Sequence, residues 1–588
     1  MGVFSFAAVH RGYLACRRRK RGTANAQRYE QRLLDHLVDT TQALQDRTYA
    51  PSRSLCFVAR QPKAREIHAA DFADRVVHHV LVPRLEALFE PVFIHDLYSN
   101  RQGKGTHAAV ERLASFMRAV NGAAAAGSAS PSGTDGGTVV RGRGEQPAVG
   151  RGVERSLCWG EERAPADGLQ APRAAAKTNP NRQGWFLQLD IRNFFNSIDQ
   201  ALLFRLINRR LKKAINGGVI DAAEARDLSW LTRVLLKQDL KRETVYRCTP
   251  KELSRVPPYK RLTEAPPGKG LPIGNLTSQF FANVYLDRLD QFVKHRLKCR
   301  YYLRYVDDFI LLHADPAQLR DWERQIERFL ADELGLALKP ERRLRPVRDG
   351  ADFLGYIVRP HYRLVRRRVV GSLRQRLDAF ERAAVSAAGL RLQPAARERL
   401  RAVLASYLGH FAHADAHRLV QRLFVERPWL GVLFDRVGDQ LRPRWQPPSV
   451  TSLRSQVVYF RRAFQPALIL VQLGIRVTLF GEDLACALAA APWIGRWRQS
   501  VFDTRNGLGT GRTWPLSHLK GLGKSLRRAG LCYGFVAEEG YLPGGMKRRV
   551  LRYLFIGSSS SRSCGRDVPL TLGPADHAVT ANAPNPIT

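Results

Sequence analysis

Apolar residues recur with helical or strand-like spacing through most of the chain. Helical periodicity over residues 26–49 puts Leu33, Leu34, Leu37 and Val38 on one predicted face. The same criterion predicts further elements in chain order: two short strands with a basic turn and then a helix (52–89), a strand running into a helix (184–211), a Gly/Pro-rich loop feeding an amphipathic helix (268–297), an amphipathic helix (316–338), a strand-like run (352–367) and basic helices (371–425).

The run RYYLRYVDDFILLH, residues 300–313, predicts a hairpin with Asp307 and Asp308 between two apolar segments. Adjacent carboxylates repel each other and lower stability unless a cation neutralises them. Because aspartate is also an ordinary turn residue, the doublet alone leaves a solvated turn and a functional site both open.

Composition shifts mark the remaining boundaries. Residues 121–183 are rich in Gly, Ala, Ser and Pro and predict a flexible insertion, and residues 426–454 contain Pro-rich stretches that predict a linker. Residues 455–556 alternate strand and helix patterns and predict a second compact α/β region. The two ends are predicted to be a basic segment (1–23) and a disordered tail (557–588).

The charge balance predicts a polyanionic partner. The 588 residues include 94 Lys and Arg against 53 Asp and Glu, a formal charge of +41. Nucleic acid is the default candidate, although a compositional bias toward Arg, Ala, Gly and Leu also raises the number. Since no apolar run reaches the roughly 20 residues that span a bilayer, we expect no membrane partner, and the N-terminal MGVFSFAAVH does not predict a signal peptide.

The eight cysteines form no CxxC pair. Their spread along the chain predicts neither a zinc module nor a disulfide framework, but isolated buried thiols in a reducing cytoplasm.

Asp190 ends the predicted strand FLQLDI, well upstream of the aspartate doublet. An acidic residue at a strand end and two more at a nearby turn can converge on divalent cations. Mg²⁺ prefers carboxylate and phosphate oxygens, and two such ions suit in-line nucleotidyl transfer. A helix N-cap for Asp190 is the alternative interpretation.

Three motifs in this order carry a family resemblance: LQLDIRNFFNSID, GLPIGNLTSQFFANVYLDRLD and RYVDDFILL resemble consecutive palm motifs of reverse transcriptases. Upstream, KAREI, DFADRVVHHVL and SNRQGKGTHAAV are similar to fingers motifs of bacterial members, and DFLGYIV resembles the strand after the catalytic hairpin. The resemblance covers roughly residues 24–425. It implies an α/β (α+β) right-hand polymerase with fingers (24–120), palm with remaining fingers elements (184–365) and helical thumb (366–425).

The resemblance also implies site residues. Asp190, Asp307 and Asp308 would hold two Mg²⁺ ions, with Mn²⁺ as an alternative, and Phe194 would test the 2′ position of the incoming nucleotide, unless it is a core aromatic. Further residues are expected to contact the triphosphate or the template: Lys63, Arg65, Arg101, Ile273, Gly274 and Gln279. The family's later lysine is left open among Lys339, Arg342 and Arg343.

LPIGNLTSQ indicates a subfamily. Ile273-Gly274 followed by Ser278-Gln279 resembles the enzymes of diversity-generating retroelements, whereas group II intron and retroviral enzymes have Gln-Gly and Ser-Pro there. Replacing an amide by a branched apolar group would loosen geometric checking of the templating pair. Drift within bacterial enzymes of other roles, including phage defence, is the alternative.

Residues 455–556 are similar to the N-terminal mismatch-recognition domain of MutS repair proteins, chiefly through Leu479 to Asp483. The wedge motif Phe-x-Glu is absent, because Arg476 and Thr478 stand at its positions. We therefore expect a repurposed duplex- or RNA-binding module, with two basic runs for phosphates: Lys524, Arg527 and Arg528, then Lys547, Arg548 and Arg549.

Together these features predict an RNA-directed DNA polymerase that uses an RNA template, a DNA or RNA primer and dNTPs, with an accessory protein left open. Error-prone retroelement mutagenesis is the favoured role. The alternatives are a defence-associated or group II intron-like enzyme, or a non-catalytic nucleic-acid-binding scaffold.

Overall fold

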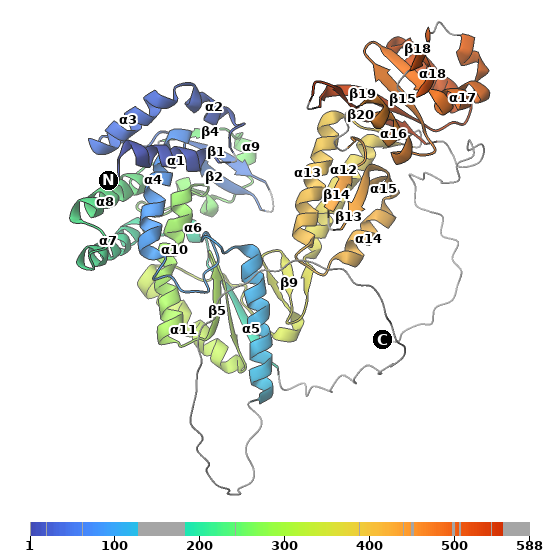
Figure 1. Ribbon diagram of the computed structural model, residues 1–588. Helices are drawn as coiled ribbons and strands as arrows, with labels where there is room; N and C mark the ends of the chain where they lie inside the picture. Colours follow the sequence, from blue (N-terminus) through green and yellow to red (C-terminus); the bar gives the residue numbers. More distant parts are fainter. Residues whose placement is uncertain are drawn as a thin grey trace, which may run out of the picture. The chain divides into compact units, whose positions relative to one another are not determined.

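The computed structural model describes the chain in eleven stretches: residues 2–18, 20–60, 63–126, 183–240, 243–386, 389–438, 440–447, 452–496, 500–504, 507–542 and 544–556. Nearly all of the insertion predicted at 121–183 and the tail predicted at 557–588 lie outside these residues. The chain forms two compact units, Met1–Gly350 and Ala351–Thr588 (Figure 1). In the described residues, no helix is both apolar enough and long enough to traverse a bilayer.

The first unit is mainly helical around two small sheets. Its helices are α1 (Phe6–Arg17), α2 (Ala24–Gln31), α3 (Leu33–Gln45), α4 (Phe72–Phe89), α5 (Thr106–Ala126), α6 (Phe194–Ser197), α7 (Gln200–Asn216), α8 (Ala222–Leu236), α9 (Pro250–Leu253), α10 (Leu276–Gln291) and α11 (Pro316–Leu334), with the short η1 (Pro258–Lys260), η2 (Leu262–Glu264), η3 (Phe292–Arg296) and η4 (Val347–Asp349). Its strands are β1 (Ser54–Ala59), β2 (Arg65–Ala69), β3 (Trp185–Asp190), β4 (Thr244–Tyr246), β5 (Tyr301–Tyr305), β6 (Asp308–His313) and β7 (Arg343–Pro346).

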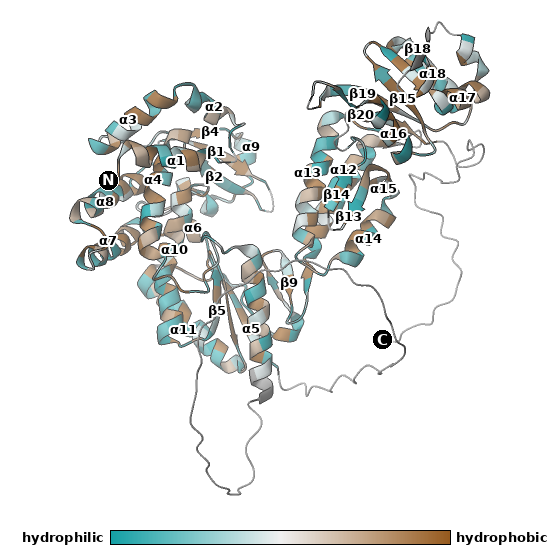
Figure 2. Ribbon diagram, viewed as in Figure 1, coloured by the Kyte–Doolittle hydropathy of each residue, from teal (hydrophilic) through white to brown (hydrophobic). Residues whose placement is uncertain are grey.

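One antiparallel sheet, in the order β5-β6-β3-β7, corresponds to the predicted palm. Helix α11 packs against β3 and β6, and α5 packs against β5 and β6, so the middle strands are buried on both faces (Figure 1). This explains why their sequences read as continuous apolar runs rather than as alternation. The strands around β5 are largely apolar in Figure 2, whereas α11 alternates between polar and apolar turns.

The second sheet, in the order β2-β1-β4, corresponds to the predicted fingers hairpin and gains its third strand from residues far along the chain. The predicted helix over 26–49 is two helices that meet at Arg32. Leu37 is buried, but Leu34 and Val38, predicted on the same buried face, are 69% and 50% exposed. All of them lie in α3, whose buried residues are Leu37, Thr41 and Leu44, so Leu34 and Val38 lie beside the buried face and the expected apolar face was wrong.

The predicted basic segment 1–23 is also folded. Helix α1 packs against α4 and buries Val9, Tyr13 and Cys16, while its arginines stay on the surface. Cys56 and Cys299 are buried as expected, although Cys56 lies beside Glu66 and His68 and is therefore not isolated. Cys486 departs from that expectation, because it forms a disulfide.

The second unit contains helices α12 (Arg367–Ala384), α13 (Pro394–Phe411), α14 (His417–Glu426), α15 (Pro428–Leu433), α16 (Leu453–Ala463), α17 (Gly481–Ala490) and α18 (Leu519–Arg528), with η5 (Pro492–Arg496) and η6 (Leu516–His518). Its strands are β8 (Ala351–Phe353), β9 (Tyr356–Val358), β10 (Arg363–Val365), β11 (Val385–Ser386), β12 (Gly389–Arg391), β13 (Phe434–Val437), β14 (Gln440–Pro443), β15 (Leu468–Leu473), β16 (Arg476–Phe480), β17 (Ser500–Thr504), β18 (Gly509–Pro515), β19 (Tyr533–Tyr541) and β20 (Lys547–Phe555).

The predicted thumb and the predicted C-terminal region share one sheet, in the order β11-β12-β20-β19-β15-β16-β18-β17. The thumb hairpin joins it because Leu390 pairs with Leu554. Residues 426–454, predicted as a linker, are instead folded in their described part: α15 and the β13–β14 hairpin bury Trp429 and Trp445 in the shared apolar core. Of the prolines that suggested a linker, Pro428 begins α15 and Pro443 ends β14.

Candidate active site

The three predicted catalytic aspartates lie together at one end of the palm sheet. Strands β3 and β6 are antiparallel neighbours, and Asp190 lies directly opposite Asp308. The backbone N–H of Ile191 donates to the carbonyl oxygen of Asp307 at 3.3 Å, which holds the hairpin turn against the end of β3. Opposite residues on one face of a sheet have Cβ atoms about 4.5–5.5 Å apart, so these carboxylates share one site.

The turn between β5 and β6 is held by a buried network, here called the turn clamp (Ser99, Asn283, Asp290 and Arg304). Val306 has a positive φ of 56°, which is unfavourable for a β-branched residue. Arg304 Nη1 donates to the Val306 carbonyl oxygen at 2.9 Å, and the Val306 N–H donates to Ser99 Oγ at 3.0 Å. The backbone N–H and the carbonyl oxygen of Val306 are therefore both fixed by side chains of the turn clamp.

Burial and mutual repulsion make two of the carboxylates hard to ionise. Burial raises the pKa of Asp307 to about 6, and the neighbouring Asp190 charge adds to this. Burial likewise raises the pKa of Asp308 to about 7, although Gln188 opposes the shift by donating from Nε2 to Asp308 Oδ1 at 3.0 Å. A site that keeps like charges together in this way is typical of one that receives cations.

Lys339, one of the three candidates for the family's later lysine, contacts this group. Its ammonium group forms an ion pair with Asp190 Oδ2, and its backbone N–H donates to the Asp190 carbonyl oxygen at 2.8 Å. Arg342 is turned elsewhere, because its guanidinium pairs with Glu323 at 3.0 Å and also with Glu327. The position of Lys339 follows from a bridge between Ile191 and Leu338.

The donor set matches a divalent cation that prefers oxygen. Asp190 Oδ1 is buried and has no hydrogen-bond partner, so one carboxylate oxygen is free for a ligand. Asp307 and Asp308 add acceptor-only oxygens when they are ionised, and Mg²⁺ or Mn²⁺ takes such oxygens in octahedral sites. Asp190, Asp307 and Asp308 are thus the residues that could hold the metal.

The fingers residues predicted to contact the triphosphate behave differently from one another. Arg65 begins β2, is exposed, and is close enough for its charge to lower the pKa of Asp307. Lys63 is exposed in the turn before it. Arg101 is instead committed within the fold: it pairs with Glu90 at 2.6 Å and donates to the Ile94 carbonyl oxygen at 2.7 Å. Its predicted contact with the triphosphate or the template stays a prediction.

A family model described as reverse transcriptase (RNA-dependent DNA polymerase) matches residues 59–358, about half of the chain. The chain belongs to the reverse transcriptase family. The match includes the catalytic hairpin, β3 and the fingers strand β2. No curated protein matches the sequence.

The solved structures that match include three of telomerase. They include telomerase from Candida albicans in complex with a telomeric RNA fragment (9% identity, TM-score 0.32, 64% of this chain and 57% of that one). Two structures from Candida tropicalis also match. The apo form has 11% identity and a TM-score of 0.32, and the match covers 57% of this chain and 60% of that one. The RNA-bound form has 11% identity and a TM-score of 0.31, and the match covers 64% of this chain and 56% of that one. The chain thus spans less than two thirds of the length of these structures.

The aromatic pair after the first aspartate corrects one prediction about this reverse transcriptase. Phe194, predicted to test the nucleotide sugar, is only 2% exposed and belongs to the core of the first unit. Phe195 lies edge-on to it at 5.4 Å between ring centroids and is half-buried. The accessible aromatic is therefore Phe195, and the sequence could not separate two adjacent phenylalanines.

The Ile-Gly loop lies against the fingers sheet. The Ile273 carbonyl oxygen accepts a hydrogen bond from the His68 N–H at 3.0 Å, and the Ile273 side chain is half-buried. Gly274 has φ +125°, and a Cβ there would lie 2.9 Å from Ile67 Cγ2. Only glycine fits this position, so the motif reflects a close backbone approach.

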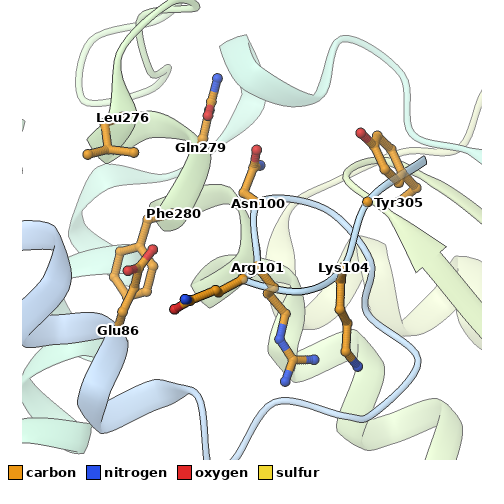
Figure 3. Close-up of a pocket in the computed structure, with 10 residues that line it drawn as sticks. Glu86, Asn100, Arg101, Lys104, Leu276, Gln279, Phe280 and Tyr305 are labelled. Atoms are coloured by element: carbon orange, nitrogen blue, oxygen red, sulfur yellow. The ribbon is translucent and has the colours of Figure 1, made fainter. Parts of the chain in front are cut away.

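Gln279 is exposed at the start of α10 and lines a cavity of about 360 Å³ next to the catalytic hairpin (Figure 3). The loop of residues 100–105 faces it, and Tyr305 borders it from the end of β5. The Tyr305 hydroxyl lies 3.3 Å from Thr106 Oγ1, which ties the cavity wall to the strand that precedes the aspartates.

In the second unit, Thr478 and Arg476, the two residues expected at the wedge positions, differ in exposure. Thr478 is fully buried in β16 and cannot stack on a base, whereas Arg476 is exposed at the strand's start. Of the basic runs, Lys524, Arg527 and Arg528 are exposed on α18. The second run is largely engaged, because Lys547 and Arg549 both pair with Glu538, at 2.7 and 3.2 Å.

Proposed function

We propose that this chain is an RNA-directed DNA polymerase that extends a primer along an RNA template. The observation that carries the proposal is the convergence of Asp190, Asp307 and Asp308, two of them with raised pKa values, around the ammonium group of Lys339. Its membership of the reverse transcriptase family supports the choice of template and product.

Two bound Mg²⁺ ions would lower the pKa of the primer 3′-hydroxyl and stabilise charge on the leaving pyrophosphate. The chain's residues supply the rest. Gln188 orients Asp308 through its amide hydrogen bond, and the turn clamp fixes Asp307 in position. Lys339 neutralises Asp190 in the free enzyme, and its ammonium group would give a proton to the leaving group.

The nucleotide would enter between the fingers sheet and the aspartates. Arg65 is placed to bind the triphosphate, because its charge already acts on Asp307 and its side chain is exposed. Lys63, in the adjoining turn, would add a second positive charge. Phe195 takes the sugar-testing role first expected for Phe194, since a half-buried ring can contact ligand and a core ring cannot.

Primer extension on a primed RNA tests this function. The wild-type chain should produce Mg²⁺-dependent cDNA, and Asp307→Asn should not. Asp315→Asn is a matched control, because Asp315 caps α11 through its side chain and lies outside the site. If wild type and Asp307→Asn gave the same signal, the chain would be a nucleic-acid-binding scaffold instead.

We further propose that copying is error-prone at template adenines, as the likeness to retroelement enzymes implies. A half-buried apolar Ile273 on a loop fixed by His68 supports this, because no side-chain amide there can check the templating pair by hydrogen bonding. Sequencing of cDNA should show substitutions concentrated at adenines and fewer of them in Ile273→Gln. Ile475→Gln, at an 83% exposed position in the second unit, is the control. Uniform low error would favour the defence-associated or intron-like role.

For the MutS-like region we propose duplex or RNA backbone binding rather than mismatch reading. Buried Thr478 cannot act as a wedge, and the exposed arginines and lysine of α18 present a basic face. Replacing Lys524, Arg527 and Arg528 by Gln should reduce the slope of log affinity against log salt by roughly 2 to 3. Lys547→Gln, whose ammonium already pairs with Glu538, should change it little.

A further inference from the structure

The fingers sheet contains a buried cluster of three residues with metal-ligating side chains, apart from the catalytic aspartates. Cys56 on β1 lies opposite His68 on β2, and Glu66 precedes His68 by two residues, so all three side chains share one face. They are 0%, 1% and 3% exposed for Cys56, His68 and Glu66. One ligand atom from each lies within 4.8 Å of the other two.

The hydrogen bonds around the cluster leave Glu66 and His68 poorly matched. Glu66 Oε2 accepts from the Leu262 N–H at 2.6 Å, while Oε1 lies 3.2 Å from His68 Nε2 and 3.7 Å from Cys56 Sγ. His68 Nε2 is nevertheless buried without a hydrogen bond of acceptable geometry. The carboxylate and the ring nitrogen thus approach each other without a good bond between them.

The other ring nitrogen has a partner on a different chain segment. The Thr244 hydroxyl donates its only hydrogen to the Leu240 carbonyl oxygen at 2.6 Å, so toward His68 Nδ1, 3.4 Å away, it can only accept. Nε2 is the ring nitrogen that faces Glu66 Oε1, at 3.2 Å, and is therefore the one placed to share an ion with the carboxylate.

We propose that Cys56, Glu66 and His68 bind a divalent transition-metal ion of the zinc class, with Cys248 as the fourth ligand. Zinc accepts this mixture of thiolate, imidazole and carboxylate in a tetrahedral site. Parallel pairing of Cys56 with Tyr246 puts Cys248 on the same face one step further along, and its thiol interacts with that of Cys56. Binding converts thiols to thiolates and releases their protons to solvent.

The ion would stabilise the part of the fingers that faces the incoming nucleotide. Glu66 and His68 flank Ile67 on the strand that begins with Arg65, and the His68 N–H holds the Ile273 carbonyl oxygen. Glu66 also fixes the start of η2 through Leu262. Coordination would therefore add a further connection among β1, β2 and the segment after β4, in the way of a structural zinc site.

Metal content of the full-length chain, prepared without a polyhistidine tag, tests the proposal. After incubation with Zn²⁺ and exhaustive dialysis, we expect about one zinc per chain by elemental analysis. Replacement by Co²⁺ should give an intense near-ultraviolet thiolate-to-cobalt band. Cys56→Ser and His68→Asn should lose both signals. Cys248→Ser, at a half-buried position and therefore milder for folding, should weaken zinc binding at least about 10-fold and reduce the cobalt band.

Two controls separate this site from other sources of metal binding. Asp307→Asn removes a catalytic carboxylate and should keep the zinc, and Cys299→Ala removes another buried thiol of the same unit and should keep it too. A wild-type chain that retains less than about 0.1 zinc and shows no cobalt band would overturn the proposal in favour of a buried His68–Glu66 ion pair. Zinc bound equally by wild type and Cys248→Ser would rule out the fourth ligand, and a Cys56–Cys248 disulfide found by mass spectrometry in reduced preparations would also overturn the site.

Discussion

Two substitutions in the turn clamp, Arg304→Met alone and Arg304→Met/Asp290→Leu together, should separate its effect on stability from its effect on activity. Arg304 and Asp290 are both fully buried and joined by two hydrogen bonds, of 2.7 Å (Nε to Oδ1) and 2.5 Å (Nη2 to Oδ2). Arg304→Met would leave Asp290 buried with only the Tyr302 hydroxyl, 2.7 Å away, as a remaining donor. Breaking a buried pair from one side costs about 3–5 kcal/mol.

The double variant Arg304→Met/Asp290→Leu removes the unpaired charge. Since apolar replacements of a buried pair are close to neutral, it should recover most of the lost free energy of unfolding. It does not restore the donor to the Val306 carbonyl oxygen, which Arg304 Nη1 supplies at 2.9 Å. The turn with φ 56° at Val306 would then relax and displace Asp307, and a displacement near 1 Å costs on the order of 100-fold in rate.

Two measurements check this: urea unfolding, and single-nucleotide incorporation at a temperature where every variant is folded. We expect the single variant to lose both stability and rate, and the double variant to regain stability while staying about 10- to 100-fold slow. If the double variant regained wild-type rate together with its stability, the clamp would be a stability element only, and its positioning role would be refuted.

Three further predictions follow from particular contacts. Lys339→Met should lower the Mg²⁺ concentration that half-activates primer extension, because the Lys339 ammonium group competes with Mg²⁺ for Asp190. It should also lower the maximal rate, because Lys339 is the proposed proton donor. An unchanged Mg²⁺ response would contradict this. Burial raises the pKa of Asp287 to about 6. Its protonated form therefore stabilises the fold below pH 4, and that contribution is lost as the pH rises through 6. In urea unfolding, the free energy of unfolding of Asp287→Asn relative to wild type should rise by roughly 1–3 kcal/mol between pH 4 and 7. Gly274→Ala should destabilise the chain by at least about 1 kcal/mol in the same assay, because its Cβ would lie 2.9 Å from a neighbour at φ +125°. Gly268→Ala, at φ +72° with open space, should cost less.

The sequence was most informative where the palm is most constrained. The strand before Asp190 and the hairpin with Asp307 and Asp308 were predicted from continuous apolar runs, and the structure pairs them in register. Motif order then indicated the family that the comparison shows. Strands buried on both faces leave little freedom of composition, so they are easy to recognise.

The hydrogen-bond and ion-pair partners of individual side chains could not be predicted in the same way. Arg101 matched a fingers motif, but its guanidinium pairs with Glu90, the residue that follows helix α4. The sequence did not separate Lys339 from the two arginines near it. Its contact with Asp190 depends on the β-bridge between Ile191 and Leu338, two residues far apart in the sequence. Nothing in the spacing of Cys56 and His68 predicted a cluster either, because cross-strand pairing creates it.

The most direct test of the central claim is single-turnover nucleotide incorporation on a primed RNA by wild type and by Asp190→Asn, Asp307→Asn and Asp308→Asn, each with saturating Mg²⁺. Because each carboxylate is proposed to hold the metal, every variant should be slower by at least about 100-fold while still binding the primed template. A wild-type chain that incorporates no nucleotide, or variants that all stay within a few-fold of wild type, would contradict the assignment of this site.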